Sequence, residues 1–118
     1  MTRQQFYSEI YDTQGLKATR SVHLVNIWIE FYGGAIDYDN TMVFASREDA
    51  NEYLDRCLER LFGTTDVYSY SRRDSFIGYY EIPVGANGGA PKDYFPEEIR
   101  DSVRAVCYSI VNAPVCKY

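Results

Sequence analysis

Few residues of this chain have side chains suited to catalysis or metal binding. His23 is the only histidine, whereas a histidine-based zinc site needs several, and a Ser–His or Cys–His pair needs its base beside the nucleophile. The cysteines at 57, 107 and 116 show neither a CxxC pair nor another metal-ligand spacing. We expect His23 to be structural or exposed, and Cys57 and Cys107 to fill the core. Cys116 is expected to be exposed and therefore open to oxidants.

Two segments have the composition of ligand-binding loops but no complete motif. Asp37-x-Asp39-Asn40 begins like a calcium loop, but it lacks the glycine and the bidentate glutamate of an EF-hand, and a hairpin turn explains it equally well. The glycine-rich residues 85–89 precede an expected helix, but no Gly-Lys-Ser/Thr follows them. No GxSxG or zinc-protease motif is present. We therefore expect no metal, no cofactor and no enzymatic activity.

Tyrosine is the compositional anomaly, because twelve tyrosines bring the aromatic fraction to 16%. If helices cover one face of a sheet, the other face could display aromatic side chains beside polar ones, as protein interfaces do. Tyrosine suits an interface because it offers a large contact area with little loss of entropy. The alternative is that the tyrosines fill strand positions and the rim of the core. The candidate binding residues are Trp28, Tyr32, Tyr68, Tyr70, Arg72, Arg73, Tyr79 and Tyr80.

The charge of the chain limits its partners. Seventeen acidic and twelve basic residues give a net charge of −5, which argues against direct binding to nucleic acid or to anionic membranes. Rows of carboxylates on two expected helices could imitate a nucleic-acid backbone. Arginines are interleaved with them, however, and Glu52–Arg56 has the favourable i,i+4 order. A solvated, ion-paired helix face is therefore the better interpretation.

The chain has the length of a single domain, which we expect to span residues 1–118. We expect this domain to be cytoplasmic, for the following reasons. The longest apolar stretch, residues 22–31, is interrupted by three polar residues and falls short of the roughly 20 residues of a membrane helix. Residues 1–5 lack the apolar region of a secretory signal. Three widely spaced cysteines indicate reduced thiols rather than a disulfide framework.

Hydrophobic patterning indicates the elements that position these residues. The clearest strand is expected over residues 20–32, where β-branched and aromatic residues are frequent. Gly33-Gly34 ends this strand, and a turn at residues 37–40 leads to a second strand at 41–45. Alternation places four apolar side chains of the first strand on one face, where we expect them to meet a helix: Val25, Ile27, Ile29 and Phe31.

The best helix is expected over residues 46–62, with Ser46 as its cap and Gly63 as its left-handed end. Residues 67–71 and 76–84 are expected to form a hairpin with its tip at 72–75. A last helix is expected from Pro96 to about Val111. For the first segment, a Thr2/Gln5 capping box indicates a helix, whereas turn chemistry at residues 12–15 indicates a hairpin arm, which we favour.

This β-β-α-β-β-α order predicts an α+β fold, in which a four- or five-stranded antiparallel sheet has both helices on one face. We expect a non-catalytic domain whose partner is another protein, and a homodimer is compatible with the sequence. By type alone, the chain is similar to small acidic phage and mobile-element inhibitors such as anti-CRISPR proteins. The alternatives are a small-ligand-binding or catalytic domain, with a pocket between the sheet and residues 85–92, or an acidic nucleic-acid mimic. An enclosed pocket would favour the ligand-binding domain, and a flat Tyr/Trp patch would favour protein binding.

Overall fold

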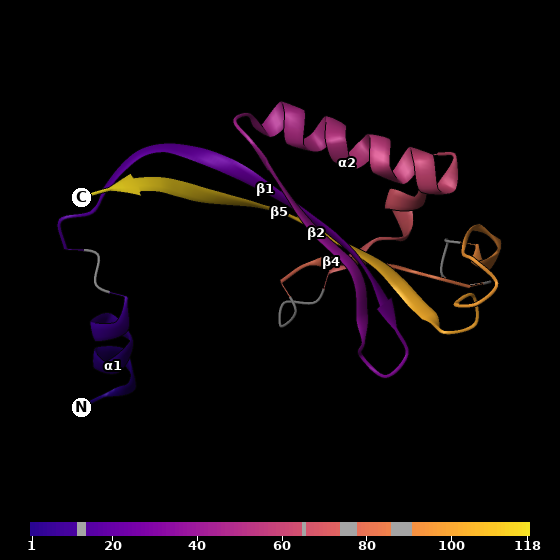
Figure 1. Cartoon of the computed structure of the whole chain (residues 1–118), viewed down its shortest axis with the longest axis horizontal. Helices are drawn as coiled ribbons and strands as arrows, with labels where there is room; N and C mark the ends of the chain where they lie inside the picture. Colours follow the sequence, from indigo (N-terminus) through magenta and orange to yellow (C-terminus); the bar gives the residue numbers. More distant parts are fainter. Residues whose placement is uncertain (12–13, 65, 74–77, 86–90) are drawn as a thin grey trace.

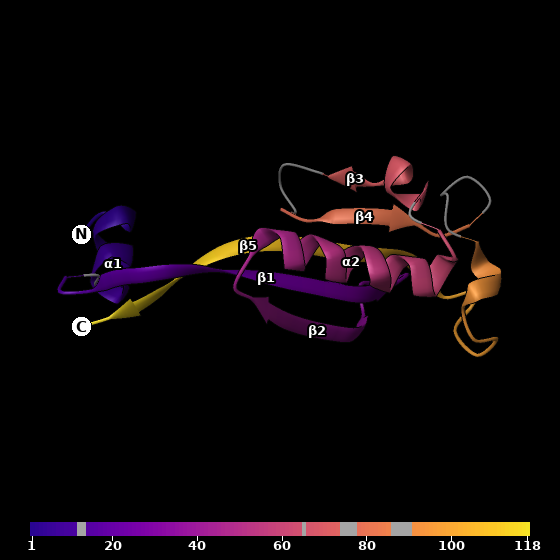
Figure 2. The ribbon, with the colours of Figure 1, turned by 90° about the horizontal axis from the view of Figure 1, so that it is seen from above.

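The computed structural model describes residues 1–11, 14–64, 66–73, 78–85 and 91–118, with the backbone alone at residues 38 and 39. Five strands form one antiparallel sheet in the order β2-β1-β5-β4-β3 (Figures 1 and 2). The predicted α+β class and antiparallel sheet are thereby confirmed. The elements are α1 (Arg3–Ile10), β1 (Lys17–Phe31), β2 (Ile36–Phe44), α2 (Arg47–Phe62), the 3-10 helix η1 (Asp66–Tyr70), β3 (Arg72–Arg73), β4 (Tyr80–Pro83), the 3-10 helix η2 (Lys92–Tyr94) and β5 (Val103–Lys117).

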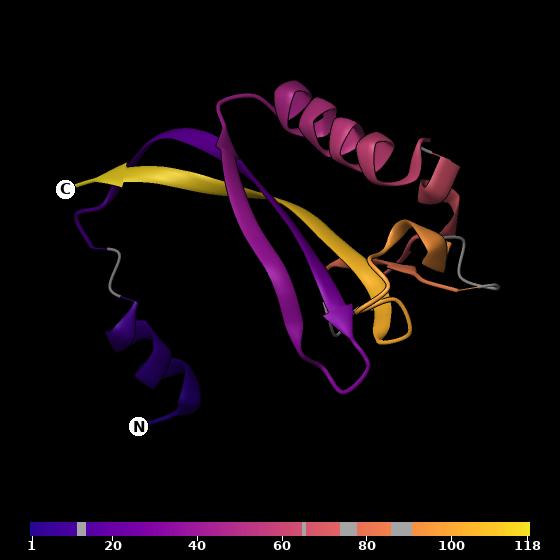
Figure 3. The same ribbon diagram turned by 45° about the vertical axis from the view of Figure 1, so that its right-hand side comes forward.

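Helix α2 covers one face of the sheet, as the sequence predicts (Figure 3). The Ser46 hydroxyl accepts a hydrogen bond from the Asp49 backbone N–H, and Gly63 ends the helix at a φ of 74°, in the left-handed region. Leu54 and Leu58 are buried against the sheet. The predicted orientation of β1 is confirmed, because Val25 is fully buried and Ile27, Ile29 and Phe31 pack against the same core.

The helix expected from Pro96 to Val111 is wrong. Residues 97–102 form turns, and β5 follows as the central strand, paired with β1 on one side and β4 on the other. Because side chains on both faces of β5 are buried over its first half, apolar residues follow one another without alternation there. Its buried side chains are Val103, Ala105, Val106, Cys107 and Tyr108. Among the described α-helices, α2 packs on the sheet, and the second helix expected there does not occur in the described residues.

The expected hairpin also differs from the structure. Residues 66–70 form the 3-10 helix η1 rather than a strand, and Arg72 and Arg73 form the edge strand β3 rather than the hairpin tip. Strand β4 occupies only Tyr80–Pro83 within the expected 76–84. Residues 74–77, which include the rest of the predicted tip, lie outside the described part of the chain.

The strand that we favoured for the first segment is wrong, because Arg3–Ile10 is the helix α1. The Thr2/Gln5 capping box is present, with Gln5 N donating to Thr2 Oγ1 at 3.1 Å and Thr2 N donating to Gln5 Oε1 at 2.7 Å. Helix α1 lies beyond the end of a long β1–β5 ribbon, away from α2 (Figures 1 and 3). This ribbon gives the molecule a radius of gyration of 17.6 Å. A compact chain of this length would have about 13 to 14 Å. Neither α1 nor α2 is long and apolar enough to span a membrane.

Candidate functional site

The sheet face opposite α2 carries an aromatic and apolar surface. Paired residues of neighbouring strands share a face, so Trp28 lies beside Cys107, and Leu24 lies between Val43 and Val111. None of the described helices lies over this surface (Figures 1 and 2). We call it the open face and define it by six residues: Leu24, Trp28, Ile36, Val43, Tyr79 and Val111.

Trp28 and Tyr79 form the aromatic centre of the open face. Their rings meet edge to face with centroids 4.8 Å apart. Beside them is a hollow of about 320 Å³, lined also by Asn26, Ile36 and Val111. Trp28 Nε1 is shielded from solvent and makes no hydrogen bond with a described residue. Burial raises the pKa of the Tyr79 phenol, and the Glu30 carboxylate adds to this effect, so the hydroxyl stays a neutral donor.

A charged cluster borders the open face where β1, β5 and β4 meet. The register between β1 and β5 shifts so that Arg104 is an extra residue in β5, and this bulge turns its guanidinium toward two carboxylates. Arg104 donates to Glu81 Oε2 at 2.5 Å and to Glu30 Oε2 at 2.7 Å. The hydrogen bond to Glu81 is the main cause of the raised pKa of Arg104, and the bond to Glu30 adds to it.

Cys107 lies beside this cluster and is fully buried. Its Sγ is 3.5 Å from Glu30 Oε2, to which it donates. Burial, reinforced by this hydrogen bond, raises the pKa of the thiol to about 12. Since the thiolate is the reactive form, Cys107 does not act as a nucleophile at neutral pH. The prediction that Cys107 fills the core is confirmed, although its element is a strand.

Three tyrosines line a separate cleft of about 350 Å³ on the α2 side of the sheet. The Tyr80 and Tyr108 rings stack at 5.2 Å, and Tyr68 meets Tyr108 edge to face at 5.8 Å. Tyr68 donates to Asp55 Oδ1 at 2.7 Å, and the Arg73 guanidinium lies 5.6 Å from the Tyr80 ring centroid. Burial is the first cause of the raised pKa of Tyr68 and of Tyr108.

The structure therefore divides the candidate residues rather than gathering them. Trp28 and Tyr79 meet on the open face, whereas Tyr68, Tyr80 and Arg73 surround the tyrosine cleft. Tyr32 and Tyr70 are exposed and line neither site, and Arg72 is exposed on the edge strand opposite Glu81. The sequence interpretation missed Tyr108 because it placed this residue on a helix. It missed Val43 and Val111 because both are found through their pairing with Leu24, and this pairing is known only from the structure.

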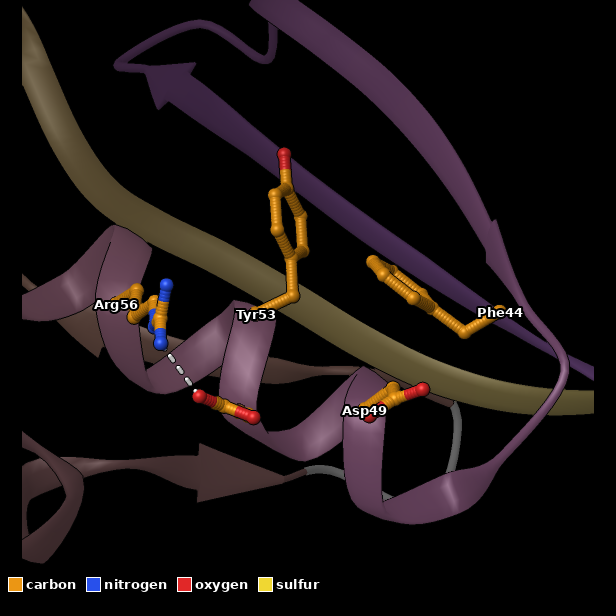
Figure 4. Close-up of a pocket in the computed structure, with 5 residues that line it drawn as sticks. Phe44, Asp49, Tyr53 and Arg56 are labelled. Carbon is orange, nitrogen blue, oxygen red and sulfur yellow. Dashed lines mark hydrogen bonds and ion pairs between the residues drawn. The ribbon is translucent and has the colours of Figure 1, made fainter.

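A further hollow of about 310 Å³ lies between β2 and α2 (Figure 4). Its aromatic walls are Phe44 and Tyr53, whose ring centroids are 5.2 Å apart. Its rim carries Asp49 and the ion pair between Glu52 and Arg56, with 2.6 Å between Oε1 and Nη2. This ion pair has the i,i+4 order that the sequence indicates for a solvated helix face.

The other predicted ligand sites have little structural description. Among the residues that the structure describes, no three His, Cys, Asp or Glu side chains gather as metal ligands do. The side chain of Asp39 and residues 86–90 lie outside the described part, so the loop pocket at residues 85–92 stays a prediction. His23 is half-buried in β1, and Cys116 is exposed, as expected.

Comparisons with known proteins add no relative: no family model, no curated protein and no solved structure matches the chain.

Proposed function

We propose that this chain is a non-catalytic protein-binding domain that binds its partner through the open face. The observation that carries this proposal is an aromatic and apolar sheet face that no described helix covers. Apolar surface left in water costs free energy, and contiguous patches of it mark sites of association. Val43, Ile36 and Val111 are exposed there around the partly buried Trp28 and Tyr79.

The polar groups of the open face fit a protein partner. Trp28 Nε1 has no acceptor among the described residues, so a carbonyl or carboxylate oxygen of the partner would complete its hydrogen bonding. Asn26 is already held by Thr41 and Ser109, which fixes the polar strip beside the indole. An apolar centre with a polar border is the usual anatomy of a protein interface.

The one buried thiol of this region supports binding rather than catalysis. Burial raises the pKa of Cys107 to about 12, so the thiol stays protonated near pH 7 and does not act as a nucleophile. Inhibition of a larger machine suits such a domain, because covering a partner's surface needs no chemistry of its own. We propose an inhibitor of the phage type only by analogy, because the chain is small and acidic as such inhibitors are.

The test uses two neighbouring residues of β2 that point to opposite faces. Val43 belongs to the open face, whereas Met42 is opposite Val25 and lies on the α2 side. Wild-type protein, Val43→Asp and Met42→Asp would be immobilised, and the proteins captured from the native host would be compared by quantitative mass spectrometry. We expect Val43→Asp to lose a partner that wild type and Met42→Asp both retain. Melting of the three proteins is measured in parallel, and equal capture by all three would refute the proposal.

Tyr79 and Trp28 are the expected energetic anchors. Truncating an anchor of this kind costs about 2 kcal/mol of binding or more, roughly a 30-fold loss of affinity. Tyr79→Ala is the cleaner variant, since the Trp28 side chain also packs on the sheet. Tyr80, which the sequence suggested as an anchor, lies on the α2 side and stacks on Tyr108, so Tyr80→Ala is the matched control. Once a partner is in hand, calorimetric titration measures both.

A second candidate function is binding of a small planar ligand in the tyrosine cleft. The convergence of Tyr68, Tyr80 and Tyr108 around about 350 Å³, with Asp55 and Arg47 in the wall, favours it. Aromatic stacking and two charges of opposite sign would orient such a ligand. A fragment library screened by NMR would shift the Tyr80 and Tyr108 ring signals if this cleft binds. Absence of such shifts at millimolar fragment would exclude this function.

A further inference from the structure

Helix α1 exposes every apolar side chain that it carries. Phe6, Tyr7 and Ile10 are 50%, 44% and 55% exposed, Tyr11 at the C-cap is 70% exposed, and no residue of the helix is buried. With Arg3, they recur at the i, i+3, i+4, i+7 and i+8 positions of one helix face. Gln4, Gln5, Ser8 and Glu9 form the opposite, polar face. A face of this kind is what a helix presents to a hydrophobic groove.

Alone, α1 is too short to be stable. It has 8 residues, whereas isolated helices shorter than roughly 12 to 15 residues are marginal in water. Its capping box contributes about 1 kcal/mol, which does not offset the cost of helix nucleation. The helix lies beyond the β1–β5 ribbon, where the body of its own chain does not cover it (Figures 1 and 3). Packing against a second surface would supply the stabilisation that it lacks.

Charge indicates what this second surface is. We call residues 1–22 and 113–118 the arm. The arm has four basic residues (Arg3, Lys17, Arg20 and Lys117) and two acidic ones (Glu9 and Asp12), a net charge of +2. The other residues, the body, include eight basic and fifteen acidic residues, a net charge of −7. The arm of one copy is thus attracted to the body of another, and this attraction falls as salt screens it.

The body offers a matching groove. The hollow between β2 and α2 has Phe44 and Tyr53 as aromatic walls, and its rim carries Asp49 and Glu52 (Figure 4). Glu52 is paired with Arg56, but Asp49 forms no ion pair with a described residue. The groove therefore combines apolar walls with one carboxylate free to meet a cation. On the apolar face of α1, the cation is Arg3.

We propose that this chain forms a homodimer by arm exchange. The apolar face of α1 from one copy docks in the β2–α2 hollow of the second copy, with Arg3 beside Asp49. In this proposal the exchange is reciprocal, so that two identical contacts close as a dimer; a one-way contact would instead grow into a filament. Each α1 helix gains the tertiary packing that it lacks in one chain. The open face takes no part in this contact and stays free for another partner.

The first test is the mass of the full chain in solution, measured by light scattering and sedimentation over micromolar to millimolar concentrations. We expect wild type to dimerise to twice its 13.6 kDa, and salt to weaken the dimer. Phe6→Asp with Ile10→Asp should give a monomer, because both charges fall on the docking face. Ser8→Asp adds the same side chain to the polar face and should leave the dimer intact.

The second test is a charge exchange. Arg3→Glu and Asp49→Arg should each raise the dimer Kd at least about 5-fold, and the double variant, which restores an opposite pair, should return to within about 2-fold of wild type. Glu48→Arg, on the same turn of α2 but outside the hollow, controls for the loss of a negative charge near the helix N-terminus. Melting is measured for each variant.

Three results would overturn the proposal. One is a wild-type protein that stays monomeric up to millimolar concentration. If the α1 amides of that monomer were protected from hydrogen exchange, α1 would dock within its own chain, which would also overturn the proposal. Another is a dimer that survives Phe6→Asp with Ile10→Asp but is lost in Val43→Asp, which would place the contact on the open face. The third is failure of the double charge exchange to restore the dimer. The open-face function stands or falls separately, on the capture by Val43→Asp and Met42→Asp.

Discussion

Arg104 is the counter-ion of Glu81: its Nη1 lies 2.5 Å from Glu81 Oε2 where strands β4 and β5 pair. Its Nη2 reaches Glu30 on β1 at 2.7 Å, so one guanidinium joins three strands. The side chains of Arg104, Glu81 and Glu30 are only 29%, 14% and 17% exposed. Water therefore solvates the carboxylates weakly, and the Arg104 guanidinium offsets the cost of burying their two negative charges.

Arg104→Met should destabilise the fold by about 3 kcal/mol, because it leaves two mostly buried carboxylates without a counter-ion. Adding Glu30→Gln and Glu81→Gln removes both charges and should recover at least half of that loss. Urea unfolding followed by fluorescence of Trp28, the only tryptophan, measures the three free energies. A single Arg104→Met variant as stable as wild type would show that the cluster is solvated.

The two capped helices should respond differently to loss of their caps. Ser46→Ala should cost about 1 kcal/mol of unfolding free energy, because α2 carries the core that holds the sheet. Thr2→Ala removes the equivalent hydrogen bond from α1. Since α1 buries no residue, the global unfolding of dilute protein should change by less than about 0.3 kcal/mol. A comparable loss in both variants would show that α1 belongs to the same cooperative unit.

Alkaline pH should destabilise the protein through Cys107. Burial, with the Glu30 hydrogen bond, raises the pKa of this thiol to about 12 in the folded chain. An ordinary thiol has a pKa near 8.5. Above that pH the unfolded chain loses the proton while the folded chain keeps it, so the contribution is complete below about pH 8.5 and is lost as pH rises toward 12. Between pH 9 and 10, wild type should lose about 1.2 kcal/mol more than Cys107→Ala. Equal slopes would contradict this.

Two valines on neighbouring strands test which face is the core. Val25 is 0% exposed beneath α2, whereas Val43 is 60% exposed on the open face. Val25→Ala should cost about 2 kcal/mol because it leaves a cavity among packed side chains, and Val43→Ala should cost less than about 0.5 kcal/mol. Equilibrium urea unfolding compares them. A large cost at Val43 would show that the open face is covered in the isolated chain.

The sequence predicts α2 and β1 correctly because several local signals agree at each. Ser46, Gly63 and a stripe of leucines all indicate one helix, and alternation in β1 separates Val25 from Trp28. The same reasoning cannot identify β5. Ile99, Val103, Val106 and Ile110 have helical spacing, but a strand whose side chains are buried on both faces shows no alternation to oppose it. The signal against the helix was its β-branched content. Pro114 follows the expected helix end, where proline is common, and β5 tolerates it because β4 pairs with β5 only as far as Tyr108.

The candidate site shows a related limit. That Trp28 and the core-facing valine lie on opposite faces follows from alternation alone. That Trp28 meets Tyr79 does not, because this contact depends on β5 lying between β1 and β4. Tyr68 and Tyr80 were grouped with Tyr79 through an expected strand at residues 67–71, where the structure has the 3-10 helix η1, and they belong to another cleft. Sequence patterns give the face of a residue within its strand, but its neighbours come from strand order.

The central position of β5 has a consequence for biosynthesis. Its pairing with β1 joins residues as far apart as Lys17 and Lys117, so the middle of the sheet waits for the last described strand to be made. Until then the ribosome holds a β1–β2 hairpin and an amphipathic helix with their apolar sides uncovered. At a synthesis rate of about 5 to 20 residues per second, this interval lasts several seconds, during which chaperones and aggregation compete for the nascent chain. A chain that a stop codon ends before β5 should therefore be retained by chaperones and should not form a smaller folded domain. A pause before β5 should prolong the interval in which chaperones bind the nascent chain.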